Sequence, residues 1–233
     1  MRNISKTTTL ESRFPLLAIE NNCIISKEGD LTVCFRVRLP EIFTVGTDVY
    51  ESIHSSWCKA IKTLPDYSIL HKQDWYLKEQ YQPDLEKNEH SFLSRSFQLH
   101  FNERPFLNHY CYVFLTKTTK SRMQSQSNFS SLCKGNLVPK EIRDKEGMRR
   151  FLESVSQFQR IINDSGHVKM DQIGEGEILG ADGQTGILEQ YFTLSRENNP
   201  VLQDIALGVE ELRIGSKKMV LHTLSNTDDL PGT

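Results

Sequence analysis

Residues 31–39 carry an apolar side chain at every second position, and this alternation constrains the fold more than any other feature of the sequence. The apolar positions are Leu31, Val33, Phe35, Val37 and Leu39, and the positions between them are Thr32, Cys34, Arg36 and Arg38. Successive side chains of a strand point to opposite faces, so this pattern predicts a strand in a sheet with one buried face and one face in water. Residues 16–25 are also apolar and predict one further strand, which joins the first through a turn at residues 27–30.

Two helices are predicted by apolar residues that recur at steps of three and four. The first covers about residues 48–64, with Asp48 as its cap and Pro65 as its stop. The other begins at about Lys145 and ends before Gly166, a residue that favours helix termination. Each of them has one apolar stripe to bury.

A third helix is predicted between two strands, over about residues 88–103. Four large apolar residues follow helical spacing there, and we expect their side chains to point inward: Phe92, Leu93, Phe97 and Phe101. The strand before this helix covers residues 67–77. The strand after it, at residues 107–115, is apolar on both faces, which is typical of a central strand.

The order strand, strand, helix, strand, helix, strand predicts an α+β fold with helices on one face of an antiparallel sheet, a ferredoxin-like variant. A smaller α/β extension follows, with a strand at residues 168–173, a short helix from Ile187 and a closing hairpin with a type II′ turn at Gly215-Ser216. The predicted division is an N-terminal tail at 1–15, the core at 16–116, a flexible loop at 117–140, a second lobe at 141–225 and a linker at 226–233.

Composition limits the classes of function. Lys and Arg number 28 against 30 Asp and Glu, a net charge of −2, whereas proteins that bind nucleic acid through phosphates usually carry a basic excess. No stretch approaches the ~20 apolar residues that cross a bilayer, so we expect a chain that folds in water without inserting into a membrane. The 5 cysteines are widely spaced and include no C-x-x-C, which is typical of reduced thiols.

Residues 174–186 form the glycine-rich stretch where a phosphate site would be sought. A phosphate-binding loop needs a lysine for the phosphate oxygens, and this stretch instead carries Glu175, Glu177 and Asp182. We therefore predict that this chain hydrolyses no nucleotide, holds no cofactor and uses the stretch as a bent connection. The alternative is a weak metal site built from the three carboxylates.

A thiol nucleophile is another candidate. His54 and Cys58 lie four residues apart on one predicted helix face, and a Cys–His pair of this kind can activate a thiolate. Cys58 also borders the apolar stripe of that helix, so we predict that it is buried and serves packing.

A nucleic-acid surface is the remaining candidate. The strands carry several aromatic residues, as RNA-binding sheets do, but few basic neighbours accompany them, which favours packing. Lys117, Lys120 and Arg122 make the loop at 117–140 mildly basic, and we keep these three as possible nucleic-acid or partner contacts.

Several stretches in succession carry a resemblance to a known family. They are residues 16–20 (LLAIE), 29–35 (GDLTVCF), 75–77 (WYL) and 212–220 (LRIGSKKMV), followed by the DLP at 229–231. In this order they resemble the N-terminal region of TraG-type ATPases of Bacteroides-type conjugative transposons, which belong to the type IV secretion ATPases. The resemblance covers most of the chain.

The resemblance implies a non-catalytic assembly and docking domain of a conjugative DNA-transfer ATPase. Its partners would be inner-membrane components of the channel, with self-association as a further property, at the cytoplasmic face of the membrane. ATP and Mg²⁺ would bind a C-terminal motor with a Walker A loop, which lies outside these residues, and no catalytic residue carries over. The alternatives are a single-stranded nucleic-acid-binding α+β module and a thiol enzyme that uses Cys58 and His54.

Overall fold

A computed structural model describes most of the chain. The described residues are 14–41, 43, 45–81, 91–102, 104–118, 145–181, 185–193, 205–208, 211–220 and 222. The predicted linker and nearly all of the predicted N-terminal tail and flexible loop therefore lie outside the described residues. The chain divides into two units, Met1–Glu175 and Gly176–Thr233.

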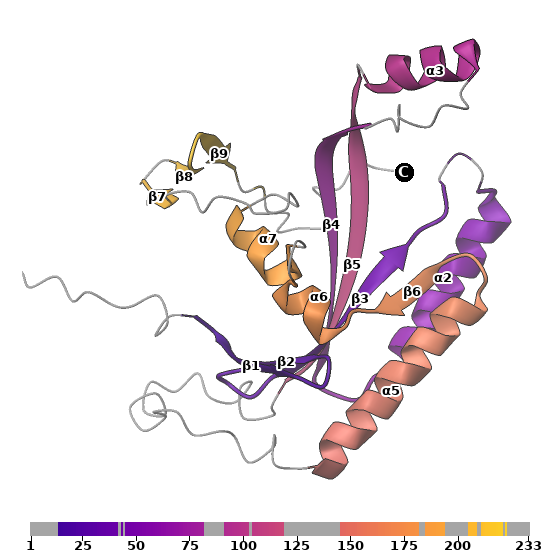
Figure 1. The fold of residues 1–233 in the computed structure, drawn as a ribbon. Coiled ribbons are helices and arrows are strands. Elements are labelled where there is room, and N and C mark those ends of the chain that lie inside the picture. The colour runs from indigo at the N-terminus through magenta and orange to yellow at the C-terminus, as the bar shows by residue number, and fades with distance from the viewer. Residues whose placement is uncertain are drawn as a thin grey trace, which may run out of the picture. The chain divides into compact units, whose positions relative to one another are not determined.

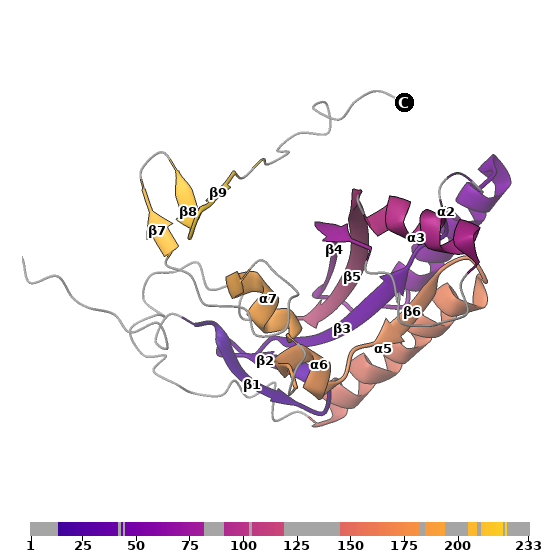
Figure 2. The same cartoon turned by 45° about the horizontal axis from the view of Figure 1, so that its top comes forward.

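The first unit is built on one antiparallel sheet (Figures 1 and 2). Its strands are β1 (Leu16–Glu20), β2 (Cys23–Ser26), β3 (Leu31–Arg38), β4 (Ser68–Gln80), β5 (Pro105–Lys117) and β6 (Lys169–Gln172). The order across the sheet is β1-β2-β3-β5-β4, and β6 also pairs with β3. The predicted α+β class with an antiparallel sheet is confirmed, and so is the central place of β5.

The first two strands form a hairpin, so the prediction of one continuous strand over residues 16–25 was wrong. Asn21 and Asn22 lie between β1 and β2 with φ of 52° and 61°. Positive φ at both central residues is the geometry of a type I′ turn, and asparagine tolerates it better than most residues. The predicted turn at 27–30 is confirmed, with Gly29 at φ 91°.

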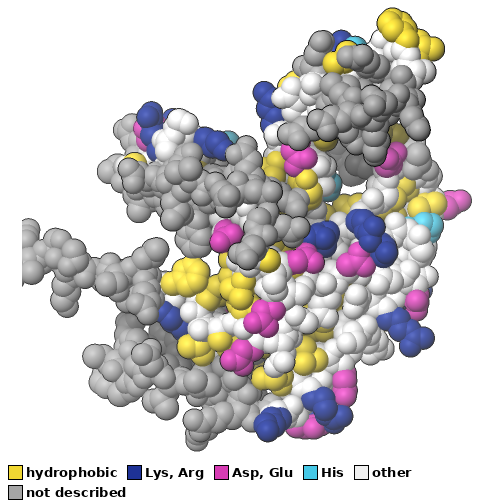
Figure 3. Space-filling view, in the orientation of Figure 1, with side chains coloured by type: hydrophobic (Ala, Val, Ile, Leu, Met, Phe, Trp, Pro, Cys, Tyr) yellow, Lys and Arg dark blue, Asp and Glu magenta, His cyan; other side chains and the backbone are white. Residues whose placement is uncertain are grey.

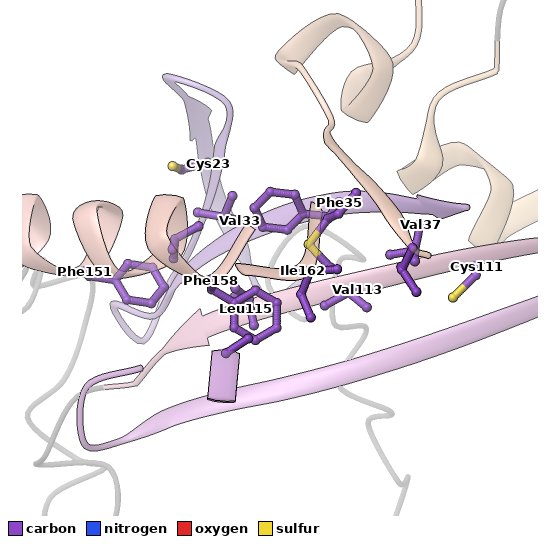
Figure 4. Close-up of a cluster of buried hydrophobic side chains, with 14 of the residues drawn as sticks. Cys23, Val33, Phe35, Val37, Cys111, Val113, Leu115, Phe151, Phe158 and Ile162 are labelled. Carbon is purple, nitrogen blue, oxygen red and sulfur yellow. The ribbon is translucent and has the colours of Figure 1, made fainter. Parts of the chain in front are cut away.

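Two helices cover one face of this sheet: α2 (Thr47–Ile61) and α5 (Lys145–Asp164). Figure 4 shows Phe151, Phe158 and Ile162 of α5 directed at side chains of β3 and β5. The ring of Phe158 meets that of Trp57 on α2 edge to face, with 5.8 Å between centroids. The apolar residues that alternate in β3 and those that recur along α5 therefore pack against each other in one core.

Two predictions about the helices need correction. Gly46, not Asp48, occupies the N-cap of α2, and no side-chain hydrogen bond caps that helix. The helix that joins α2 on the sheet is α5, which sequence reasoning had assigned to a second lobe at 141–225. The boundary between units instead falls after Glu175, because β6 pairs with β3 and draws α5 and β6 into the first sheet.

The second unit is small. Its elements are α6 (Glu175–Leu179), which begins at the boundary, α7 (Ile187–Thr193), β7 (Ile205–Leu207), β8 (Leu212–Ile214) and β9 (Lys217–Met219). Gly215 has φ 57° and is followed by Ser216 without a positive φ, as a type II′ turn requires, so the predicted hairpin is confirmed. The strand β7 was missed by sequence reasoning.

Candidate docking surface

Several exposed apolar side chains of the first unit belong to an arm that is built on two strands. β5 pairs with β3 only as far as Val37↔Cys111, whereas its pairing with β4 continues to Gln80↔Pro105. The outer parts of β4 and β5 therefore form a ribbon that extends past β3, with α3 (Phe92–Asn102) between them in the chain (Figure 1). We call Trp75–Gln80, α3 and Pro105–Tyr110 together the arm.

The apolar side chains of α3 are turned outward, so the prediction that they face inward was wrong. Phe92 is 84% exposed, Leu93 78% and Phe97 64%; the side chain of Phe101 lies outside the described residues. Figure 3 shows hydrophobic side chains at the surface where α3 lies in Figure 1. The physical reason is position: the core lies between β3, β5 and the helices α2 and α5, and α3 is attached beyond that layer.

Polar contacts hold the two strands of the arm together. On one face, the Tyr110 hydroxyl donates to Glu79 Oε1 at 2.6 Å and the Asn108 amide donates to Glu79 Oε2 at 2.8 Å. On the other face, the His109 ring stacks on Tyr76 with 4.7 Å between centroids. These side-chain contacts add to the backbone ladder and stabilise the ribbon.

Asp74 is the centre of a charged cluster at the base of the arm. It accepts a hydrogen bond from His109 Nε2 at 2.8 Å and forms an ion pair with Lys72. Burial alone raises the pKa of Asp74, but hydrogen bonds from Lys72, His109 and Cys111 together with the Lys72 charge outweigh it and leave the pKa below its usual range. Burial raises the pKa of the Cys111 thiol to about 11, so this cluster offers no activated thiolate.

The Cys–His pair forms, but Cys58 is exposed, and the prediction of burial was wrong. Its sulfur lies 3.5 Å from His54 Nε2. Both residues sit on the side of α2 turned away from Ala60 and the core. The structure thus brings these two together as predicted, without placing a third polar group of the described residues in a hydrogen bond with either of them.

The predicted basic contacts are only partly within the described residues. Lys117 ends β5, where its ammonium donates to the carbonyl of Asp66 and lies 5.7 Å from the centre of the Tyr67 ring. It is therefore engaged in the connection between α2 and β4. Lys120 and Arg122 lie outside the described residues.

The acidic glycine-rich stretch also differs from its prediction. Glu175 and Glu177 belong to the short helix α6 rather than to a bent connection, and Asp182 lies outside the described residues. The Glu175 N–H donates to Asn22 Oδ1 at 2.9 Å, which fixes the start of α6 to the β1–β2 turn. Among the described residues, no group of three or more His, Cys, Asp or Glu side chains is placed to hold a metal ion.

Sequence reasoning missed the arm for two reasons. The periodicity of α3 reports an amphipathic helix and does not say whether its apolar stripe meets the same chain or a partner. The pairing of Asp74 with His109 joins residues 35 apart in sequence, which no local pattern reveals. The polar residues Lys78, Glu79 and Gln80 were the available signal, since β4 continues through them past the apolar segment predicted from the sequence.

Comparison with known proteins gives one partial match. A family described as "Domain of unknown function, B. Theta Gene description (DUF3875)" matches residues 3–55, which include β1, β2, β3 and the start of α2. No curated protein matches the chain. In the part of the chain that the structure describes, no helix has the length and apolar character needed to cross a membrane.

Proposed function

We propose that this chain is a non-catalytic docking module that assembles a conjugative DNA-transfer ATPase of the type IV secretion class onto its channel. The observation that carries the proposal is the outward apolar side of α3, at the end of an ordered arm. Exposed apolar surface of this kind marks interaction sites on folded proteins. Burying one phenylalanine or leucine against a partner contributes about 1.5–3 kcal/mol, so Phe92 and Leu93 alone supply a useful part of a binding energy.

The identity of the larger assembly in this proposal comes from the resemblance to TraG-type ATPases. Two of the stretches that carry it, residues 16–20 and 29–35, lie within the segment of the family match, whose description assigns no function. In this proposal the partners are inner-membrane components of the channel, and the module works at the cytoplasmic face of the membrane. ATP and Mg²⁺ are bound by a separate motor domain of the parent protein.

The proposal is tested in the parent ATPase in donor cells. Phe92→Ser with Leu93→Ser should lower DNA transfer at least tenfold and reduce the share of the protein recovered with the membrane fraction. The matched control is Ser96→Ala, an exposed polar position on the same helix, which should leave both readouts unchanged. Unfolding transitions of the purified variants that match that of the wild-type protein show that the fold is intact. Normal transfer by the double variant would contradict the proposal.

A further inference from the structure

β4 forms one edge of the sheet, and among the described strands it pairs only with β5. The N–H of Thr118 donates to the carbonyl of Tyr67 at 2.9 Å, immediately before the first pair of the ladder, Ser68↔Lys117. Hydrogen-bonded and non-hydrogen-bonded pairs alternate along antiparallel strands. Odd-numbered residues of β4 therefore direct their backbone groups at β5, and even-numbered residues from Ser68 to Gln80 present N–H and C=O at the outer edge.

Natural edge strands are usually short or protected, because a row of open backbone groups is a template for another strand. β4 is long, with 13 residues. It also carries exposed apolar side chains on both faces of the sheet, with Ile69 52% exposed on one and Tyr76 63% on the other. This edge has both the backbone groups and the side chains that strand addition uses.

We propose that β4 pairs antiparallel with β4 of a second copy of the chain, around a two-fold axis at Gln73. An axis perpendicular to the sheet keeps each face on its own side, so Gln73 lies opposite its own equivalent. Lys72 then lies opposite Asp74 of the second copy, and the same pair occurs twice by symmetry. Opposite charges on directly facing residues stabilise a strand pair, and like charges destabilise it.

Apolar residues also meet apolar residues in this register. Ile69 lies opposite Leu77 of the second copy, and Leu70 lies opposite Tyr76 of the second copy. The two exposed apolar side chains of the edge, Ile69 and Tyr76, are thereby covered. The backbone groups fit as well, since Lys72 and Asp74 are even-numbered and form hydrogen-bonded pairs across the new interface, whereas Gln73 occupies a non-hydrogen-bonded site.

The neighbouring registers place like charges together. An axis at Lys72 sets two lysines against each other, one at Asp74 sets two aspartates against each other, and one at Trp75 sets Lys72 against Lys78. An axis at Tyr76 brings Asp74 opposite Lys78 but leaves Ile69 and Leu70 without facing residues. Charge and apolar contacts together therefore select the axis at Gln73.

Ten strands would lie side by side across the joined sheet, five from each copy, with β6 paired to β3 in each copy in addition. Open twisted sheets of about ten strands occur without splitting. This inference deepens the proposed function by naming a second copy as one partner, but its evidence is the fold alone. Loss of the β4 contact would leave the α3 surface intact. The α3 variants therefore test the docking proposal, and the cross-linking and sedimentation experiments below test the β4 dimer separately.

Cysteine cross-linking tests the register. In a Cys58→Ser, Cys133→Ser background, Gln73→Cys should give a disulfide-linked dimer after mild copper–phenanthroline oxidation, because non-hydrogen-bonded sites bring facing Cβ atoms close together. Tyr76→Cys tests the competing register with the axis at Tyr76, and Ser55→Cys, at an exposed position of α2, measures cross-linking by random collision. Cross-linking of Gln73→Cys no greater than that of Ser55→Cys, or stronger cross-linking of Tyr76→Cys, would overturn the proposal.

Charge exchange tests the interface without a new covalent bond. The wild-type chain should sediment as a dimer, and Lys72→Asp should shift it to monomer while its circular dichroism stays unchanged. The double variant Lys72→Asp, Asp74→Lys restores opposite charges across the axis and should restore the dimer. A wild-type chain that sediments as a monomer at 100 µM, a concentration at which even an affinity of about 10 µM would give mostly dimer, contradicts the proposal.

Discussion

Asp74 connects the two strands at the base of the arm through its side-chain contacts. It accepts a hydrogen bond from His109 on β5 and pairs with Lys72 on its own strand, and its pKa is held below the usual range. A carboxyl of this kind stabilises the fold at pH values above its unfolded pKa, near 3.9, and the contribution is lost as pH falls through the folded pKa.

The first prediction concerns this pH dependence. Asp74→Asn should lower the free energy of unfolding at pH 5 by no more than about 1 kcal/mol, because the pair is partly exposed. The difference between variant and wild type should shrink from about pH 4 downward, as Asp74 becomes protonated in the wild-type chain. Urea unfolding of both proteins between pH 3 and pH 6 measures it. A difference that grows toward pH 3 would show that the hydrogen bonds do not favour the carboxylate.

The second prediction compares two phenylalanines that sequence reasoning treated alike. Phe158 is fully buried against Trp57, so Phe158→Ala should cost about 3–5 kcal/mol through lost contacts and a cavity. Phe92 is 84% exposed, so Phe92→Ala should change stability by no more than about 0.5 kcal/mol. Chemical denaturation gives both values. A large loss for Phe92→Ala would place that side chain in the folding core.

Among the elements, the β1–β2 turn has two tasks. Asn22 adopts φ 61° within the turn, and its side-chain oxygen accepts the N–H of Glu175 at the start of α6. A turn near the N-terminus thereby fixes a helix start more than a hundred residues later. The apolar pattern of the strands could not predict this contact, because it forms only when the fold brings the β1–β2 turn close to the segment that follows β6.

The third prediction separates these tasks. Asn22→Gly retains access to positive φ and loses only the hydrogen bond, at a cost of about 1 kcal/mol. Asn22→Ala loses the hydrogen bond and also strains the backbone, which adds roughly 1–2 kcal/mol. Thermal or urea unfolding measures the order wild type, glycine variant, alanine variant. Equal stability of the two variants would mean that backbone strain contributes nothing at this position.

For the whole molecule, the proposal of a docking module implies that this chain does not hydrolyse ATP. The fourth prediction is that the purified 233-residue chain releases no phosphate from ATP beyond the level of heat-inactivated protein, because its glycine-rich stretch carries glutamates in place of a phosphate-binding lysine. Phosphate release with Mg²⁺ present measures this. Turnover that survives further purification would overturn the docking proposal for this chain.

The nucleic-acid alternative is tested on the same protein. Lys117, the one predicted basic contact among the described residues, is engaged by Asp66 and Tyr67. We therefore expect no single-stranded DNA binding by fluorescence anisotropy at low salt, where phosphate contacts are strongest. Salt-dependent binding that is lost in a Lys117→Ala, Lys120→Ala, Arg122→Ala variant would favour the alternative.

The sequence by itself determined most of the strands and helices, and which side of them is apolar. The alternation at residues 31–39 and the stripe of α5 needed only local spacing, because side-chain direction follows from backbone geometry. Glycine positions likewise predicted the turns at Gly29 and Gly215, since glycine tolerates positive φ, whereas the turn at Asn21 and Asn22 was missed.

Only the tertiary structure decided what each apolar stripe meets. It placed α5 on the sheet through the pairing of β6 with β3, and it placed α3 beyond the core on two strands whose pairing continues past β3. Spacing in sequence fixes the direction of a side chain relative to its own element, whereas burial depends on which other element arrives there. That is why Phe158 and Phe92 look alike in the sequence and differ completely in exposure.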